Sequence, residues 1–460
     1  MHEHGRSTLP TDETGRTLDR LAGLEKAIPP TLIRQVLQAT GRVNGRACEL
    51  THEVMMWVVL AMGLLTHLPI RQVFRHARRM GLGTNCPARS SLCTGRQRLG
   101  TEPLRALHAA VVKPLATPDT PGAFYRQWRL MGFDGTVMDV PDSEANAGFG
   151  RSSGSRGQGA FPQIRKVSLV ELGTHVEVAM TIGGWHDDER TLARTLYERI
   201  PDDALLLEDR GFFSYQDWKA LYLRRKLLIR MKCHHVLKSL QPLSDGSYLA
   251  KVYPNGHDRD KDRNGIMERV IRYTLDDPQR TGHGEIHCLL TNLLDETECP
   301  TLELIECYHE RWEEELVFDE QKTHQDPRRA EKPAQLRSET PEGVRQELYA
   351  LSLGHFVIRS LMFEAARTAD LDVDRLSFVG CFRILKCRLP ECDSRTPAAL
   401  TQWYEALLAE MRTEQNEGRR NRINPRVIKR KMSKWKKKRA EHRRPPPLLK
   451  PFAQCVGMKT

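Results

Sequence analysis

The first quarter of the chain has the hydrophobic and polar pattern of consecutive amphipathic helices. Between residues 17 and 115, apolar residues recur at spacings of three and four, which is the helical period. Thr31 and Thr51 stand where helix caps are expected, and the most apolar run of the chain, Val54 to Leu65, follows the second of them. A membrane span needs about 20 apolar residues. We therefore predict that this run is a buried core helix and that the chain does not enter a membrane.

The next predicted helices carry a basic face. In the segment that begins at Ile70, apolar residues occupy one side and arginines the other, and a further helix is predicted from Ser90 to Leu99. Short consecutive helices with a basic face are typical of helix-turn-helix DNA-binding modules, although a helical bundle with a solvated basic face has the same pattern. We predict that residues 1–120 form a helical, DNA-binding domain. Its candidate DNA contacts are Arg71, Arg75 and Arg78.

From Gln127 the pattern changes to apolar, β-prone runs separated by helical segments. The predicted order is a strand that ends at Asp134, strands at 164–172 and 175–182 that form a hairpin around Gly173, a helix at 187–200, a strand at 204–207, a helix at 211–225 and a strand at 226–231. In this order Asp134 and Asp209 each stand at the end of a strand. We treat residues 121–232 as the first part of a mixed α/β domain.

A β-rich stretch interrupts this domain at residues 233–295. It contains β-like segments at 246–254, 267–275 and 285–294, and the polar run at 255–265 is predicted to be a loop. Residues 296–412 return to helical patterns and complete the domain. The remaining residues, 413–460, form a basic tail that we expect to be extended or disordered unless it is bound.

Charge and cysteine usage narrow the class of protein. The net charge is +12, and most of the excess lies between Arg419 and Arg444, so the rest of the chain is close to neutral. Such a segment attracts polyanions, largely without sequence preference, and Lys429, Arg430 and Lys431 are its candidate DNA contacts. The eleven Cys show no CxxC spacing, which favours free thiols in a reducing compartment. With no signal peptide at its start, the protein is predicted to be cytoplasmic.

The stretch from Thr301 to Lys322 is predicted to be a single amphipathic helix, because its apolar residues recur every three or four positions without Pro or Gly. At about 100° per residue, Tyr308, Arg311, Glu315 and Lys322 fall on one narrow face. A solvated helix with an Arg311–Glu315 ion pair would explain part of this pattern. The complete order, Tyr-x2-Arg-x3-Glu-x6-Lys, is far more specific.

This order resembles the C-terminal signature of DDE transposases of the insertion sequence 4 family. The segments FDGTVMDVPDS around Asp134 and EDRGFF around Asp209 match the family's contexts for its two aspartates. The resemblance implies a ribonuclease-H-like catalytic core, with the β-rich stretch as an insertion between the second Asp and the Glu. It also implies that the first and fourth strands bring Asp134 and Asp209 together, with the helix of Glu315 beside them.

Three separated carboxylates suit two-metal phosphoryl transfer, and hard oxygen ligands favour Mg²⁺, for which Mn²⁺ can substitute. We expect Asp134 to bridge two ions, Asp209 to hold one and Glu315 the other. The resemblance further implies that Tyr308, Arg311 and Lys322 contact DNA phosphates. The implied partners are double-stranded DNA, both as terminal inverted repeats and as target, and a second copy of the chain in a synaptic complex on the nucleoid of a prokaryote.

Two alternatives and one misleading motif are considered beside this hypothesis. The chain could be a non-catalytic DNA-binding protein derived from a transposase, or a ribonuclease-H-like nuclease without strand transfer. Residues 150–154 match the GxSxG pattern of serine hydrolases, but the strand and helix that this motif requires are not predicted around it. We interpret this segment as a loop in which Arg151 contacts DNA. No ATP-binding GxxxxGK[ST] motif occurs.

Overall fold

A computed structural model of the chain describes the placement of most of its residues. These are residues 17–44, 48–78, 85–154, 157–232, 235, 237–278, 280, 282–309, 311, 313–326, 335–416, 427–428, 436–437 and 450–459. Their contacts define two compact units. The first unit comprises residues 1–121, 134–199 and 314–416, and the second comprises residues 122–133, 200–313 and 417–460. Both units contain helices and strands, so the prediction of a mixed α/β protein is confirmed.

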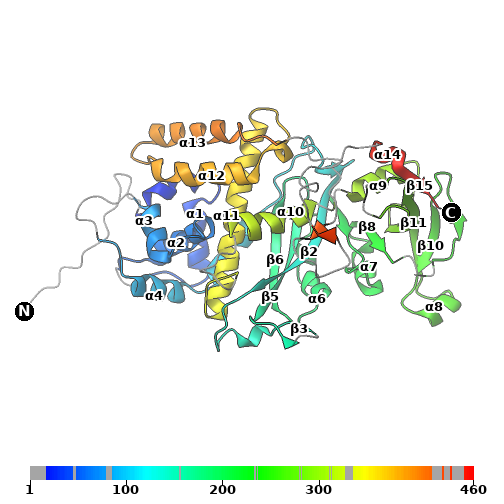
Figure 1. Cartoon of the computed structure of the whole chain (residues 1–460), viewed down its shortest axis with the longest axis horizontal. Helices are drawn as coiled ribbons and strands as arrows, with labels where there is room; N and C mark the ends of the chain where they lie inside the picture. The colour runs from blue at the N-terminus through cyan, green and yellow to red at the C-terminus, as the bar shows by residue number, and fades with distance from the viewer. Residues whose placement is uncertain are drawn as a thin grey trace, which may run out of the picture. The chain divides into compact units, whose positions relative to one another are not determined.

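Helices make up most of the first unit (Figure 1). They are η1 (Asp19–Leu24), α1 (Pro30–Ala39), α2 (His52–Leu64), α3 (Ile70–Ala77), α4 (Arg89–Leu99), α5 (Glu102–Val111), α10 (Glu313–Asp319), η5 (Glu320–Gln325), α11 (Pro341–Arg367), η6 (Val373–Arg375), α12 (Phe378–Arg388), η7 (Leu389–Glu391) and α13 (Pro397–Met411). The long helix α11 packs against α2, α5, α12 and α13. Within the described ranges, no helix is both long enough and apolar enough to cross a membrane.

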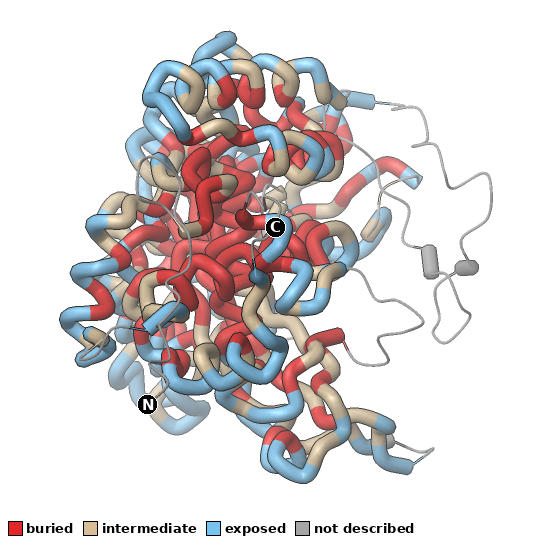
Figure 2. The backbone as a smooth tube through the Cα atoms, turned by 90° about the vertical axis from the view of Figure 1, so that its left-hand side faces the viewer, coloured by how far each residue is buried: buried red, intermediate tan, exposed pale blue. Residues whose placement is uncertain are grey.

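α2 is the buried core helix that its apolar sequence predicts. Every residue from Val54 to Leu64 is buried, and the Thr51 hydroxyl caps the helix by accepting the Val54 N–H at 3.1 Å. α2 passes so close to α11 that a Cβ atom on Gly63 would overlap the Ala350 carbonyl oxygen. Figure 2 shows that in most other helices buried residues lie on one side of the helix and exposed residues on the opposite side.

Replacement of Gly63 by Ala is expected to destabilise the first unit, because the new methyl group would meet a backbone oxygen that no side-chain rotation can move. Overpacking of this kind costs about 1–3 kcal/mol. The measurement is the free energy of unfolding in urea for Gly63→Ala, with Gly148→Ala as the control variant. Gly148 lies in η2 (Ala147–Phe149), where an added Cβ meets nothing within 4 Å. Equal stability of the two variants would contradict a close approach of α2 and α11.

Two predictions for the N-terminal helices are wrong. α1 begins at Pro30 without a side-chain cap, so Thr31 lies inside the first turn, since proline is favoured at the first helical position. Arg78 follows α3 and is only 4% exposed, so it does not belong to an exposed basic face. Burial lowers the pKa of its guanidinium, and the Asp19 carboxylate opposes this shift. Arg71 and Arg75 are exposed on α3, as predicted.

The first unit also contains the predicted hairpin. Its strands are β5 (Gln163–Glu171) and β6 (Val176–Gly184), which pair antiparallel, and they are followed by α6 (Glu189–Arg194) and η3 (Tyr197–Arg199). The short strands β3 (Ser153–Gly154) and β4 (Gly157–Gln158) pair in the preceding loop. β5 lies beside β2 (Trp128–Asp139) in the strand order. β2 continues to Asp139, so the prediction that this strand ends at Asp134 is wrong.

The second unit is built on a sheet. In spatial order its strands are the first part of β2, β7 (Ala204–Glu208), β8 (Lys226–Met231), β12 (His287–Thr291), β11 (Ile266–Leu275), β10 (Tyr248–Val252) and β9 (Gln241–Pro242), and β1 (Phe124–Tyr125) pairs with β2. β2, β7 and β8 run parallel, whereas β12, β11 and β10 continue the sheet antiparallel. The strands predicted at 204–207, 226–231, 246–254, 267–275 and 285–294 are confirmed as β7, β8, β10, β11 and β12. The β-rich stretch extends the same sheet, because β12 pairs with β8.

One helix of the second unit corrects a further prediction. The helices of this unit are α7 (Tyr215–Tyr222), α8 (Gly256–Asp260), α9 (Thr301–His309) and α14 (Phe452–Cys455). α8 lies in the predicted loop at 255–265, where the Asn255 side chain caps it by accepting the Asp258 N–H.

The end of the predicted tail is folded. Phe452 and Cys455 are buried, and β15 (Val456–Met458) pairs with β11, so the prediction of an extended or disordered tail is wrong for residues 450–459. The short strands β13 (Val427–Ile428) and β14 (Lys436–Lys437) pair in parallel. The candidate DNA contacts Lys429, Arg430 and Lys431 lie outside the described residues.

Candidate active site

Asp209 stands directly after a buried strand in the second unit. All five residues of β7 are buried, and β7 pairs in parallel with β2 up to the partners Gly132 and Leu207. Asp134 follows Gly132 by two residues, and Asp209 follows Leu207 by two residues. The prediction of a short buried strand at 204–207 that leads to Asp209 is confirmed, and the strand extends one residue further, to Glu208.

Glu208, the last residue of β7, is a buried carboxyl group that sequence reasoning missed. It is 3% exposed, and burial raises its pKa to about 8, with a further contribution from the Asp217 carboxylate. Its carbonyl oxygen accepts a hydrogen bond from the Tyr308 hydroxyl at 3.2 Å. A side chain of α9 therefore holds the strand end that carries Asp209.

Replacement of Glu208 by Gln is expected to remove a pH dependence from stability. The folded-state pKa lies above the ordinary carboxyl value, so the folded state binds more protons than the unfolded state between these two pKa values. The free energy of unfolding of the wild type should therefore fall by on the order of 3 to 4 kcal/mol as the pH rises from about 5 to about 8. An amide does not titrate, so the variant should lose this slope.

Urea unfolding across this pH range measures the slope. Glu306→Gln, an exposed position on α9, is the matched control and should keep the wild-type slope. If Glu208→Gln kept that slope as well, the pH dependence would not come from Glu208.

Asp134 lies within β2 in the first unit, close to a lysine and a second acid. The Asp134 carboxylate accepts the Gly135 N–H at 2.8 Å. The Lys322 ammonium group donates to the Thr136 hydroxyl at 2.9 Å, so η5 contacts β2 directly after Asp134. A Cβ atom at position 135 would overlap the Glu189 carboxylate. The glycine after Asp134 is therefore needed for the approach of Glu189, a residue that no sequence pattern singled out.

The prediction that Thr301 to Lys322 form a single α-helix is wrong. The chain forms α9, then α10, and then the π-helical segment η5. A π-turn closes its hydrogen bond over one more residue than an α-turn, so a rotation of about 100° per residue does not hold as far as Lys322. Tyr308, Glu315 and Lys322 consequently lie on three different segments.

The four signature residues differ in exposure. Glu315 on α10 is exposed and Lys322 is half-buried. Tyr308 and Arg311 are each 5% exposed, and the Arg311 guanidinium lies 5.9 Å from the centroid of the Tyr308 ring. In this structure Tyr308 and Arg311 are therefore packing residues of the second unit, a role that their spacing did not predict.

Arg151 closes the loop before β5. Its guanidinium donates to the carbonyl oxygens of Gly159 and Ala160 and pairs with the Asp142 carboxylate. These bonds stabilise the loop, so they explain an arginine at this position without a contact to DNA.

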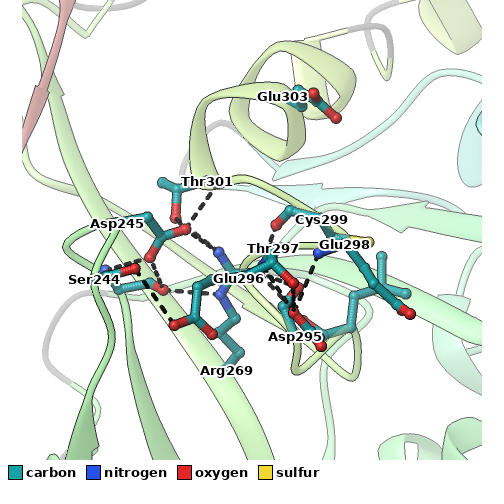
Figure 3. Close-up of polar contacts among 12 residues, drawn as sticks. Ser244, Asp245, Arg269, Asp295, Glu296, Thr297, Glu298, Cys299, Thr301 and Glu303 are labelled. Carbon is teal, nitrogen blue, oxygen red and sulfur yellow. Dashed lines mark hydrogen bonds and ion pairs between the residues drawn. The ribbon is translucent and has the colours of Figure 1, made fainter.

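A buried arginine organises the start of α9. Arg269 on β11 is fully buried and pairs with the Asp245 carboxylate. It also donates to the Thr301 hydroxyl at 2.9 Å and to the Cys299 carbonyl oxygen at 2.6 Å. The Asp245 carboxylate accepts the Thr301 backbone N–H at 3.0 Å, and Figure 3 shows both charged side chains meeting at Thr301. The network thus joins β11 to the first residue of the helix that carries Tyr308.

The candidate donor set suits a hard divalent cation. Asp134 lies on β2, Asp209 follows β7 and Glu315 lies on α10, and each offers the carboxylate oxygens that Mg²⁺ and Mn²⁺ prefer. Glu189 adds another carboxylate beside Gly135. The chemistry of these side chains therefore fits the predicted metal.

Two family models and several known proteins match this chain. Residues 18–109 match the model of the insertion element 4 transposase N-terminal region, and residues 130–352 match the transposase DDE domain. The chain is 28% identical over 422 residues to the transposase InsG for insertion sequence element IS4 of Escherichia coli strain K12, which covers 90% of this chain and 93% of that protein. It is 26% identical over 195 residues to the putative transposase InsZ of the same strain, over 41% of this chain and 62% of that protein. Among solved structures, a piggyBac transposase synaptic complex with hairpin DNA matches with a TM-score of 0.40 and 11% identity, over 86% of this chain and 81% of that chain.

Proposed function

Because this chain belongs to the insertion sequence 4 family of DDE transposases, we propose that it moves its element by a cut-and-paste route. It binds the terminal inverted repeats, hydrolyses the phosphodiester at each end and directs the freed 3′-hydroxyl at target DNA. Synapsis brings two ends together, so the active species is a homodimer on DNA, acting at the nucleoid in the cytoplasm of a bacterium.

The element order supports a ribonuclease-H-like core. Strands β2, β5 and β6 precede α6, and β7, α7 and β8 follow, which is the order predicted for that fold. The β-rich stretch at 233–295 then separates the strands from α9 and α10. On this proposal residues 121–232 and 296–412 form the catalytic core.

The observation that carries the proposal is the register of β2 and β7. Asp134 and Asp209 each follow the last paired residue of neighbouring parallel strands by the same two positions. This equal spacing supports Asp134 and Asp209 as the two aspartates of the DDE set, with Glu315 as the glutamate. Asp134 would hold two Mg²⁺ ions, and Asp209 and Glu315 one each. Such a pair of ions, when bound, activates the attacking oxygen and stabilises the leaving oxygen.

Basic residues supply the contacts to DNA in this proposal. Lys322 brings a point charge to Thr136 on β2, two residues after Asp134. Arg71 and Arg75 on α3 are exposed in the N-terminal domain. Lys429, Arg430 and Lys431 would add attraction without sequence preference. Arg78, Tyr308 and Arg311 are not proposed as contacts, because each of them is at most 5% exposed.

The test is an assay with a labelled duplex that carries the inverted repeat flanking this gene, an unlabelled target duplex, and Mg²⁺ or Mn²⁺. Cutting at the repeat boundary followed by joining of the 3′ ends to the target is the expected result. Cutting without joining would assign a nuclease instead. Specific binding without cutting in either metal would assign a non-catalytic DNA-binding protein.

A further inference from the structure

The π-helical segment η5 has unusually buried polar residues. Glu320 is 4% exposed, and Gln321 and Gln325 are each 1% exposed. Glutamate and glutamine are rarely buried unless they have partners. π-helical turns occur mostly as single turns within α-helices, frequently at functional sites. The partners of these residues therefore indicate what the segment does.

Glu320 is anchored to α11 and to the β5–β6 hairpin. Its carboxylate pairs with the Arg359 guanidinium, contacts the His355 ring nitrogen Nε2 at 2.8 Å, and contacts the His175 Nδ1 at 3.3 Å. Burial alone would raise the pKa of Glu320, but Arg359 and the two histidines hold that pKa well below its usual range. Glu320 is therefore a buried carboxylate, and its main counter-charge stands on a different helix.

Gln321 is anchored to both strands of the hairpin. Its side-chain oxygen accepts a hydrogen bond from the Lys166 ammonium group on β5, and its amide nitrogen donates to the Glu177 carboxylate on β6 at 3.1 Å. Lys166 and Glu177 also pair with each other at 2.6 Å and are both buried. This bond joins η5 to a charged pair in the interior of the first unit.

The other two anchors reach β2, α2 and α11. Lys322 donates to the Thr136 hydroxyl and to the Val137 carbonyl oxygen on β2. The Gln325 amide nitrogen bridges two carbonyl oxygens, that of Gly63 on α2 at 2.8 Å and that of Leu351 on α11 at 2.9 Å.

We propose that η5 is a positioning element for the active site, in which Glu320, Gln321, Lys322 and Gln325 fix the helix that carries Glu315 against β2. The consecutive residues Glu320, Gln321 and Lys322 bind α11, the β5–β6 hairpin and β2, so the helix cannot slide or rotate without breaking buried bonds. Glu315 lies five residues before Glu320 on the same uninterrupted helical run. The buried residues of η5 therefore determine the position of Glu315. This inference rests on the proposed function of Glu315.

The experiment compares two buried glutamines with similar bonding. Gln325→Leu, in η5, removes the bridge between the carbonyl oxygens of Gly63 on α2 and Leu351 on α11. Gln346→Leu removes a bridge between the carbonyl oxygens of Arg96 and Gly100, at 2.9 and 2.8 Å, within the helical part of the first unit. Both residues are 1% exposed. Single-turnover cleavage of the inverted-repeat duplex, its binding, and the Mg²⁺ concentration for half-maximal cleavage are measured for both variants below their melting temperatures.

We expect Gln325→Leu to lower the cleavage rate at least about tenfold and to raise the half-saturating Mg²⁺ concentration, because small displacements of a catalytic group are costly. Duplex binding should stay within about threefold, and Gln346→Leu should cleave within about twofold of the wild type. Equal rates for the two variants, whether both lowered or both unchanged, would overturn the positioning role. If Gln325→Leu does not fold, Gln321→Leu is judged by the same criteria. Absence of cleavage by the wild type would reject the proposed function itself and this inference with it.

Discussion

Replacement of Asp134 or Asp209 by Asn, or of Glu315 by Gln, is expected to abolish strand cleavage and leave binding of the transposon end largely intact. Each substitution keeps the shape of the side chain but replaces a carboxylate with a neutral amide, which is a poor ligand for Mg²⁺. Two-metal stabilisation of the transition state is worth several kcal/mol. Each variant should therefore lose at least about 10³-fold in the cleavage rate.

The measurement is single-turnover cleavage of the labelled inverted-repeat duplex in Mg²⁺, with duplex binding followed in parallel. Asp139→Asn is the matched control, because Asp139 lies on the same strand as Asp134 and accepts the Gln163 amide at 2.7 Å, which an asparagine oxygen can also do. This variant should cleave at the wild-type rate. Cleavage by all three acid variants, or an equal loss in Asp139→Asn, would reject the assignment of the catalytic acids.

Replacement of Arg269 by Met is expected to destabilise the second unit by about 3–5 kcal/mol, the usual cost of removing one partner of a buried ion pair. Methionine has a similar length and fills the space, but it leaves the Asp245 carboxylate without its counter-charge and the Cys299 carbonyl oxygen without its donor. Arg269→Lys keeps the charge but has no planar fork, so it should fall between the wild type and Arg269→Met.

Urea unfolding of the three proteins measures these differences. The control is Arg105→Met, which removes the exposed pair of Arg105 with Glu102 on α5. Exposed pairs of this kind contribute about 0.5 kcal/mol or less. A loss for Arg269→Met as small as that for Arg105→Met would show that the network at the start of α9 does not support the fold.

The predictions that proved correct rest on local pattern. A short, wholly apolar run predicts a buried strand, and β7 is such a strand with Asp209 directly after it. The apolar run after Thr51 predicts a capped core helix, and α2 is buried along its length. In both cases the residues that decide the structure are neighbours in the sequence.

The predictions that failed concern polar residues whose partners are far away in the sequence. Arg78 looked like a member of an exposed face, but it is buried near Asp19. The spacing of residues 301–322 predicts one continuous α-helix, but a π-helical turn begins at Glu320. Neither the burial nor the turn is visible from spacing alone.

The sequence by itself determined the family, because the signature with its Tyr, Arg, Glu and Lys is a local order of residues. The local contexts of Asp134 and Asp209 likewise predict the candidate acids. Only the tertiary structure decided which buried contacts hold the segments that carry those residues. Glu320 meets Arg359 and His175, and Arg269 meets Asp245 and Thr301. The physical reason is that a buried charge must have a partner, but the partner can come from any element that the fold brings close.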